Sequence, residues 1–182
     1  PPYITLTAAL GRFNEAGFLG ANYQTFSTGG DPSAKDFVVQ GLVPPPALTA
    51  QRIAERQAML DAVDTLGRGT ADPAMKQMGD YQRRAWELMT GQAREVFDLS
   101  REKPELRAAY GRDRFGQSCL AARRLIENGV PYVTINYGGW DTHKEHFQAM
   151  RRLLPPLNSG LATLLSDLAD RGLLDSTIVV CL

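Results

Sequence analysis

Asp141 and His143 are the residues of this chain whose types and spacing point most directly to chemistry. They belong to the segment GGWDTH at 138–143, which follows a β-branched stretch at 131–136. A carboxylate oxygen and a neutral imidazole nitrogen are ordinary ligands of zinc or manganese. Two ligands do not complete a metal site, so a third and a fourth must come from elsewhere, with His146 as a further candidate.

The same loop also has a structural interpretation. Asp141 or Thr142 would then cap the helix that follows, where an acidic group also suits the helix dipole, and His143 would be a surface residue. Gly138 and Gly139 either let the backbone approach a ligand or turn the chain tightly after the strand. The sequence leaves both interpretations open.

A cysteine and two arginine pairs are the other residues with chemical potential. Cys181 follows an apolar strand-like run, where a nucleophile could stand, but no base accompanies it and a buried structural cysteine is the simpler interpretation. Arg123 with Arg124, and Arg151 with Arg152, are interpreted as solvated helix faces, although arginine pairs can also clamp a phosphate or sulfate group.

The elements around the Asp141 loop predict a parallel strand–helix–strand unit. The strand at 131–136 is followed by a helical stretch at 143–172, which we expect to kink or break at Pro155 and Pro156. A second strand is predicted at 177–180, parallel to the first and reached by a right-handed crossover. Ligands of open α/β sheets bind outside the carboxyl ends of the strands, which is where the loop lies.

The remaining chain predicts flanking helices in a single α/β domain. Residues 1–47 are rich in Gly and Pro and are interpreted as an irregular arm, residues 48–128 as a helical layer, and residues 129–182 as the strand–loop–helix–strand core piece. Within the layer, helices are expected at 50–66, 73–89, 90–97, 102–110 and 114–128.

Composition excludes several classes of protein. The 182 residues are 43% apolar and 22% charged, which are globular values. Twenty basic and twenty acidic residues cancel, which argues against a nucleic-acid partner. No apolar run approaches the roughly 20 residues of a membrane span. Because the chain starts at Pro1 and stops on a strand-like run, we expect an internal fragment of a longer protein.

Several short segments together resemble the DUF1501 family, proteins of unassigned function abundant in planctomycetes. The resemblance covers nearly the whole chain, and the combination is more specific than any one piece. The matching segments are GFLG at 17–20, GDP at 30–32, FDLS at 97–100, YGR at 110–112, FGQ at 115–117, LAARRLIE at 120–127, GGWDTH at 138–143 and DRGLLD at 170–175.

The DUF1501 family in turn resembles the alkaline phosphatase–sulfatase superfamily. That likeness implies an alkaline phosphatase-like α/β sheet between helices, with metal ligands on loops at strand ends. Asp141 and His143 would be the first acidic–histidine pair, holding a divalent metal ion such as zinc, manganese or calcium. The second pair and the nucleophile are expected outside these residues. The resemblance also implies a periplasmic or otherwise exported parent protein.

Two functions are compatible with this resemblance. One is a metal-dependent hydrolase of phosphate or sulfate esters that acts on a small anionic ester substrate. The alternative is a non-catalytic extracytoplasmic binding or assembly protein that retains the fold. Because the nucleophile and the remaining ligands are expected elsewhere, we expect the 182 residues alone to be inactive. We make no prediction of the oligomeric state.

Overall fold

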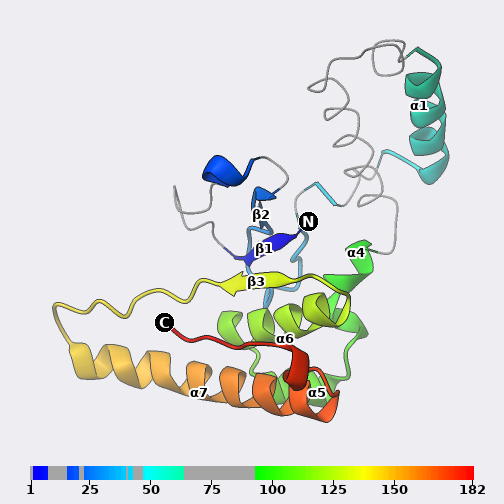
Figure 1. The fold of residues 1–182 in the computed structure, drawn as a ribbon. Helices are drawn as coiled ribbons and strands as arrows, with labels where there is room; N and C mark the ends of the chain where they lie inside the picture. The colour runs from blue at the N-terminus through cyan, green and yellow to red at the C-terminus, as the bar shows by residue number, and fades with distance from the viewer. Residues whose placement is uncertain (1, 8–15, 21–22, 40, 43–46, 64–92) are drawn as a thin grey trace. The chain divides into compact units, whose positions relative to one another are not determined.

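In a computed structural model the chain forms two compact units, which are described separately (Figure 1). The first unit combines Pro1–Gln40 with Val96–Leu182, and the second is Gly41–Glu95. The structure describes residues 2–7, 16–20, 23–39, 41–42, 47–63 and 93–182.

The first unit contains a parallel sheet of three short strands. These are β1 (Tyr3–Leu6), β2 (Phe26–Ser27) and β3 (Tyr132–Ile135), in the order β2-β1-β3. β1 is central and pairs with β3 from Tyr3 beside Tyr132 onward. The expectation of an irregular arm at the N-terminus is therefore wrong in part, because that segment supplies two strands. The strand predicted before the Asp141 loop is confirmed as β3.

Helix α6 (Arg114–Glu127) forms where local signals for both ends are strong, and it confirms the predicted helix. The Asp113 side chain caps the first turn by accepting from the Gly116 N–H at 3.0 Å. At the other end, Gly129 has a φ of 81°, and its N–H donates to the Ile126 carbonyl. Glycine adopts this left-handed conformation without a steric penalty, so the chain turns at once toward β3.

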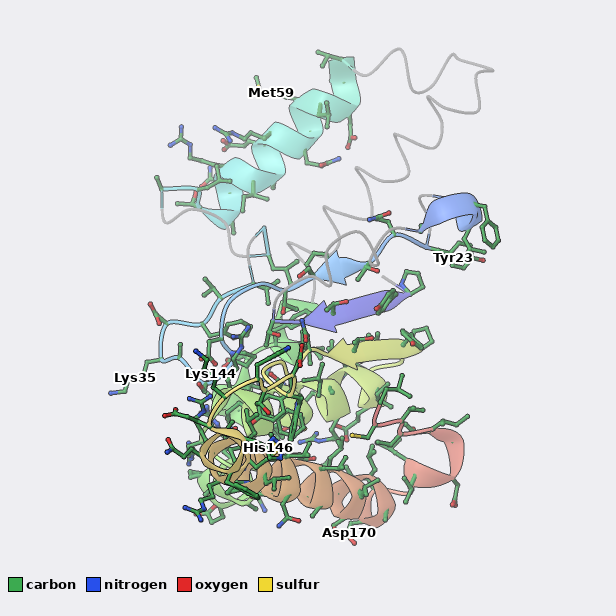
Figure 2. All side chains as sticks on the ribbon, turned by 90° about the vertical axis from the view of Figure 1, so that its left-hand side faces the viewer. Tyr23, Lys35, Met59, Lys144, His146 and Asp170 are labelled. Atoms are coloured by element: carbon green, nitrogen blue, oxygen red, sulfur yellow. The ribbon has the colours of Figure 1, made fainter. Side chains whose placement is uncertain are left out.

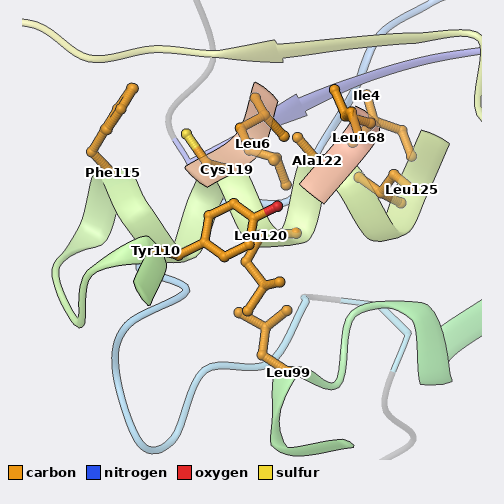
Figure 3. Close-up of a cluster of buried hydrophobic side chains, with 12 residues drawn as sticks. Ile4, Leu6, Leu99, Tyr110, Phe115, Cys119, Leu120, Ala122, Leu125 and Leu168 are labelled. Atoms are coloured by element: carbon orange, nitrogen blue, oxygen red, sulfur yellow. The ribbon is translucent and has the colours of Figure 1, made fainter. Parts of the chain in front are cut away.

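The main hydrophobic cluster lies between the sheet and α6 and continues beyond α6. Ile4 and Leu6 of β1 and Leu120 and Leu125 of α6 are at most 2% exposed (Figure 3). Leu168, on the long helix at 146–170, belongs to the same cluster. Because α6 is covered on nearly every side, polar residues of this helix also become buried.

Helix α7 (His146–Asp170) packs against α6 rather than against the sheet (Figure 1). It is one 25-residue helix that contains Pro155 and Pro156, so of the two outcomes expected there, a kink or a break, the break does not occur. Each proline removes one backbone hydrogen bond. The face carrying Leu164 and Leu168 is buried, and we attribute the continuity of α7 to this packing.

Helix α5 (Pro104–Tyr110) confirms the short helix expected before α6 and is tied directly to α7. It ends at Gly111, whose φ is 95°. The carbonyl of Ala109 would be unpaired at this helix end. Instead it accepts from the Ser159 hydroxyl at 3.1 Å and from the Thr163 hydroxyl at 2.9 Å. These bonds fix the end of α5 on the surface of α7.

The strand predicted at 177–180 does not form. The segment after η5 (Leu174–Ser176) is extended, and Val179 packs against the hydrophobic cluster. Ile178 is 91% exposed. A β-branched run becomes a strand only when another strand pairs with its backbone, and within the described part of the chain none does.

The second unit contributes one described helix of more than one turn, α1 (Ala50–Val63), which lies inside the predicted 50–66. Its expected apolar face is buried only at Ile53, whereas Met59 and Val63 are 70% and 72% exposed.

The helix predicted at 73–89 lies outside the described residues. Shorter helical turns are η2 (Gly17–Leu19), α4 (Ala93–Val96) and η4 (Leu99–Arg101). None of the helices in the described ranges is long and apolar enough to span a membrane.

Arg123 is the most notable buried polar group, because its side chain is only 1% exposed. Its guanidinium contacts three carboxylates: Glu127 at 2.6 Å, Glu102 at 2.9 Å and Asp167 at 3.0 Å. Arg124 also pairs with Glu102. The interpretation of these two arginines as a solvated helix face is therefore wrong.

The ion pairs extend into a balanced network that joins η4, α6 and α7. Asp167 accepts from Arg171 at 2.6 Å and from the Tyr110 hydroxyl at 2.8 Å. Burial raises the pKa of Tyr110, so its hydroxyl stays protonated and donates. We call this group the Arg123 network; its charged members are Arg123, Arg124, Arg171, Glu102, Glu127 and Asp167.

The Arg123 network predicts how stability depends on pH. Burial alone would raise the pKa values of Glu102 and Asp167, but hydrogen bonds from arginine outweigh burial and lower both. Unfolded carboxyls titrate near pH 4. The stabilisation is therefore complete above that pH and is lost as the pH falls through the lower folded values. We expect the urea midpoint to fall steeply below about pH 4, where the unfolded carboxyls begin to take up protons.

The matched variant for this prediction is Asp167→Asn, which cannot titrate. Its free energy of unfolding should be lower than that of the wild type, with the largest difference at pH 7 and a smaller one as Asp167 of the wild type becomes protonated. A difference of constant size between pH 7 and pH 3 would show that the Asp167 charge does not account for the acid sensitivity.

Candidate metal-binding loop and strand-end pocket

The loop between β3 and α7 is anchored at its start by Tyr137. The Tyr137 ring lies 4.5 Å from the Phe115 ring and 5.6 Å from the Trp140 ring, measured between centroids. Its hydroxyl donates to the Leu153 carbonyl at 3.0 Å, and Trp140 donates back to the Tyr137 carbonyl at 2.7 Å. Gly139, with a φ of 99°, makes the turn that follows. The first half of the loop is therefore fixed to α6 and α7.

Asp141 and His143 lie in the second half of the loop and are brought together there. Their side chains are 90% and 82% exposed, and Nδ1 of His143 lies 3.4 Å from Oδ1 of Asp141. Two metal-ligand atoms thus face solvent within reach of a common ion. The donor set, one carboxylate and one imidazole, fits zinc or manganese.

Neither Asp141 nor Thr142 caps α7, so the expected cap is wrong, whereas His143 is a surface residue, as the same interpretation expected. The helix begins at His146, and the residue before it, Glu145, has left-handed dihedrals (φ 52°, ψ 37°) without a side-chain cap. Thr142 instead shares a 2.7 Å hydrogen bond with Nδ1 of His146. Figure 2 shows His146 and Lys144 where the loop enters α7.

Two ligands do not complete a metal site by themselves. A structural zinc site uses four protein ligands, and a catalytic one commonly uses three with an open position. No group of three or more His, Cys, Asp or Glu side chains with metal-binding geometry occurs among the residues that the structure describes. A metal ion held by Asp141 and His143 would therefore need further ligands from outside those residues.

The other sequence candidates have different outcomes. Cys181 is exposed, so its interpretation as a buried structural cysteine is wrong. Cys119 is the buried cysteine, and burial raises the pKa of its thiol to about 12. Arg151 and Arg152 are exposed, as expected of a solvated helix face.

A small pocket that the sequence did not predict opens where β1 and β3 end. Its volume is about 170 Å³, several times the roughly 30 Å³ that one water occupies in the liquid. Sequence patterns gave no signal for it, because its lining is drawn from three separate segments. We call it the strand-end pocket; its lining includes Thr7, Arg114, Phe115, Ser118, Asn136 and Tyr137.

Thr7 is the most unusual residue of the strand-end pocket. It has a φ of 71°, a left-handed conformation that a β-branched residue rarely adopts. The last residue of β2 and the residue after it hold Thr7 there: the Thr7 N–H donates to the Thr28 hydroxyl at 3.1 Å, and the Thr7 carbonyl accepts from the Ser27 hydroxyl at 3.3 Å. Thr7 is 1% exposed, and its own hydroxyl has no hydrogen-bond partner among the described residues.

Comparison with known proteins gives one match. The sequence fits the family described as "Protein of unknown function (DUF1501)" over residues 1–182. No curated protein and no solved structure matches the chain. The match confirms the family expected from the short segments, and the chain accordingly belongs to the DUF1501 family.

Proposed function

We propose that this protein is a metal-dependent hydrolase of phosphate or sulfate esters, with Asp141 and His143 as two of its metal ligands. The observation that carries the proposal is their juxtaposition: two exposed ligand atoms lie 3.4 Å apart on the loop that follows β3. In parallel α/β sheets this edge is where substrates bind. The resemblance to the alkaline phosphatase–sulfatase superfamily supplies the choice of reaction.

The chemistry assigned to these residues is limited to holding the ion. A bound divalent ion would polarise the ester oxygen and lower the pKa of a bound water. Asp141 would offer a carboxylate oxygen and His143 a neutral ring nitrogen. Tyr137 and Trp140 position the loop through their contacts with Phe115 and Leu153. Hydrolysis adds water across the ester, giving an alcohol and free phosphate or sulfate.

The alternative is a non-catalytic extracytoplasmic binding or assembly protein. Its support is that the described residues supply only two clustered ligands. On this alternative, the loop would present Asp141 and His143 to a partner instead of to an ion. The same measurement separates the two proposals.

The test is the metal content of the purified protein, in its full-length form where the gene encodes a longer chain. We expect stoichiometric zinc, manganese or calcium in the wild type and its loss in His143→Ala and Asp141→Asn, because each removes a ligand. Hydrolysis of nitrophenyl phosphate and nitrophenyl sulfate should fall in parallel. Elemental mass spectrometry gives the first reading and absorbance the second.

Arg151→Ala is the control, because Arg151 is an exposed side chain of α7 and a guanidinium offers no acceptor atom to a metal ion. This variant should keep its metal and its activity. Equal metal content in the wild type, His143→Ala and Asp141→Asn would overturn the proposal. Protein without metal and without turnover would favour the binding-protein alternative.

A further inference from the structure

The strand-end pocket combines hydrogen-bond donors from three separate segments. Thr7 follows β1, Asn136 follows β3, and Arg114 opens α6. The Asn136 amide can donate two hydrogen bonds, and the Arg114 guanidinium carries a permanent positive charge. Arg114 forms no ion pair with any residue in the described ranges. The pocket is therefore rich in donors and has one cation at its edge.

The unpaired hydroxyl of Thr7 is the strongest indication that the pocket accepts a ligand. A buried hydroxyl without a partner costs about 1–3 kcal/mol. Thr7 additionally holds a strained φ of 71°, fixed by Thr28 and Ser27. Strained backbone with an orphaned polar group is typical of binding sites, where the ligand completes the missing bond.

The first turn of α6 adds backbone donors at the same place. The Asp113 cap accepts from the Gly116 N–H, and the Asp113 carbonyl accepts from the Gln117 N–H. The N–H groups of Arg114 and Phe115 have no partner within the helix, and both residues line the pocket. A helix N-terminus favours negative charge. The Asp113 carboxylate opposes an anion there, so the affinity is expected to be modest.

Ser118 contributes a different group. Its hydroxyl donates to the Arg114 carbonyl at 2.7 Å, so within the pocket it offers an acceptor and not a donor. The donors left for a ligand are those of Thr7, Asn136 and Arg114. Phe115 and Tyr137 supply apolar walls beside these donors.

We propose that the strand-end pocket binds a small oxyanion of phosphate or sulfate size, with Thr7, Asn136 and Arg114 as its donors. The pocket volume of about 170 Å³ suits a group of a few heavy atoms. The inference goes beyond the proposed hydrolase function, because this anion site uses neither Asp141 nor His143. An anion held here, free or as part of a larger ligand, sits at the carboxyl ends of two adjacent strands.

The test is calorimetric titration of the protein with inorganic phosphate, and separately with sulfate, in chloride buffer of constant ionic strength containing a chelator. Thr7→Val keeps the side-chain shape but removes the hydroxyl, whereas Thr7→Ser keeps the hydroxyl. We expect saturable binding by the wild type and Thr7→Ser. Binding should be about tenfold or more weaker in Thr7→Val and in Arg114→Met.

Two controls make the result specific. Arg151→Met removes an exposed arginine of α7 and should leave anion affinity unchanged, which separates local binding from general charge. His143→Ala should also bind the anion as the wild type does, even if metal binding is lost. Absence of saturable binding by the wild type, or equal binding by the wild type, Thr7→Val and Arg114→Met, would overturn the inference. Because Thr7→Val removes only an unpaired buried hydroxyl, its thermal midpoint should not fall.

Discussion

Replacing Arg123 by methionine is expected to lower the free energy of unfolding by about 3–5 kcal/mol, because a charged partner is removed from a buried network. The Arg123 side chain is 1% exposed and contacts Glu102, Glu127 and Asp167. Methionine fills much of the same volume, so the lost stability comes mainly from carboxylates left without a cation and only slightly from a cavity. Urea denaturation at pH 7 gives the value.

Arg151→Met is the control for this prediction, because it makes the same change on an exposed face and should stay within about 0.5 kcal/mol of the wild type. Adding Glu102→Gln and Asp167→Asn to Arg123→Met should restore part of the loss, since the uncompensated charges then disappear. A loss below about 1 kcal/mol in Arg123→Met would mean that water reaches the network and screens it.

Gly116→Ala is the second change with a large expected effect, a loss of about 3 kcal/mol or more. A Cβ at position 116 would lie 2.1 Å from the Tyr110 carbonyl oxygen and 2.7 Å from that of Gly111. Both atoms are backbone at the end of α5, so no side chain can swing away. Helix propensity alone predicts the opposite sign, a gain of about 1 kcal/mol. The shift of the thermal midpoint therefore decides which effect is larger.

Two other glycines provide a graded comparison. At Gly160 the Cβ would meet the Phe115 ring at 2.9 Å and the Cα of Gly116 at 3.3 Å, which are longer approaches than those at Gly116, so Gly160→Ala should lose less stability than Gly116→Ala. At Gly138 no atom of the described residues lies within 4 Å of the added Cβ, and the substitution should be close to neutral. Equal stability of all three variants would contradict close packing between α5, α6 and α7.

Sequence patterns predicted the elements that carry their own local signals. The limits of α6 follow from a capping aspartate and a terminal glycine, and β3 follows from a continuous β-branched run. β1 was missed because Tyr-Ile-Thr-Leu is short and becomes a strand through pairing with β3, far away in the chain. The strand at 177–180 was predicted from composition, yet no strand within the described ranges pairs with it.

Burial was harder to predict than secondary structure. Arg123 was placed on a solvated face because adjacent arginines usually are. Instead α6 is enclosed, and the charge of Arg123 is matched by the carboxylates of Glu102, directly after η4, and of Asp167 on α7. The break expected at Pro155 and Pro156 did not occur, and we ascribe this to the buried face of α7. Both errors arise because tertiary contacts override local preference.

The Asp141–His143 pair could be predicted from the sequence, whereas the strand-end pocket could not. Asp141 and His143 are two residues apart, so their juxtaposition follows from a short turn. The strand-end pocket depends on the φ of Thr7 and on three segments meeting at one sheet edge, neither of which leaves a sequence pattern. Its residues Thr7, Asn136 and Arg114 could be found only from the structure.

The length of α7 places the residues that govern stability and the residues of the Asp141 loop far apart, so that stability and loop chemistry can be engineered independently. The helix rises about 1.5 Å per residue, so His146, beside the loop of Asp141 and His143, stands roughly 30 Å from Asp167 in the Arg123 network. Mutational effects at sites this far apart, with no shared partner, usually add. The network end of the helix can thus be redesigned for heat or acid tolerance, and the loop end can be screened for binding of the proposed metal ion, in separate libraries whose best members are then combined.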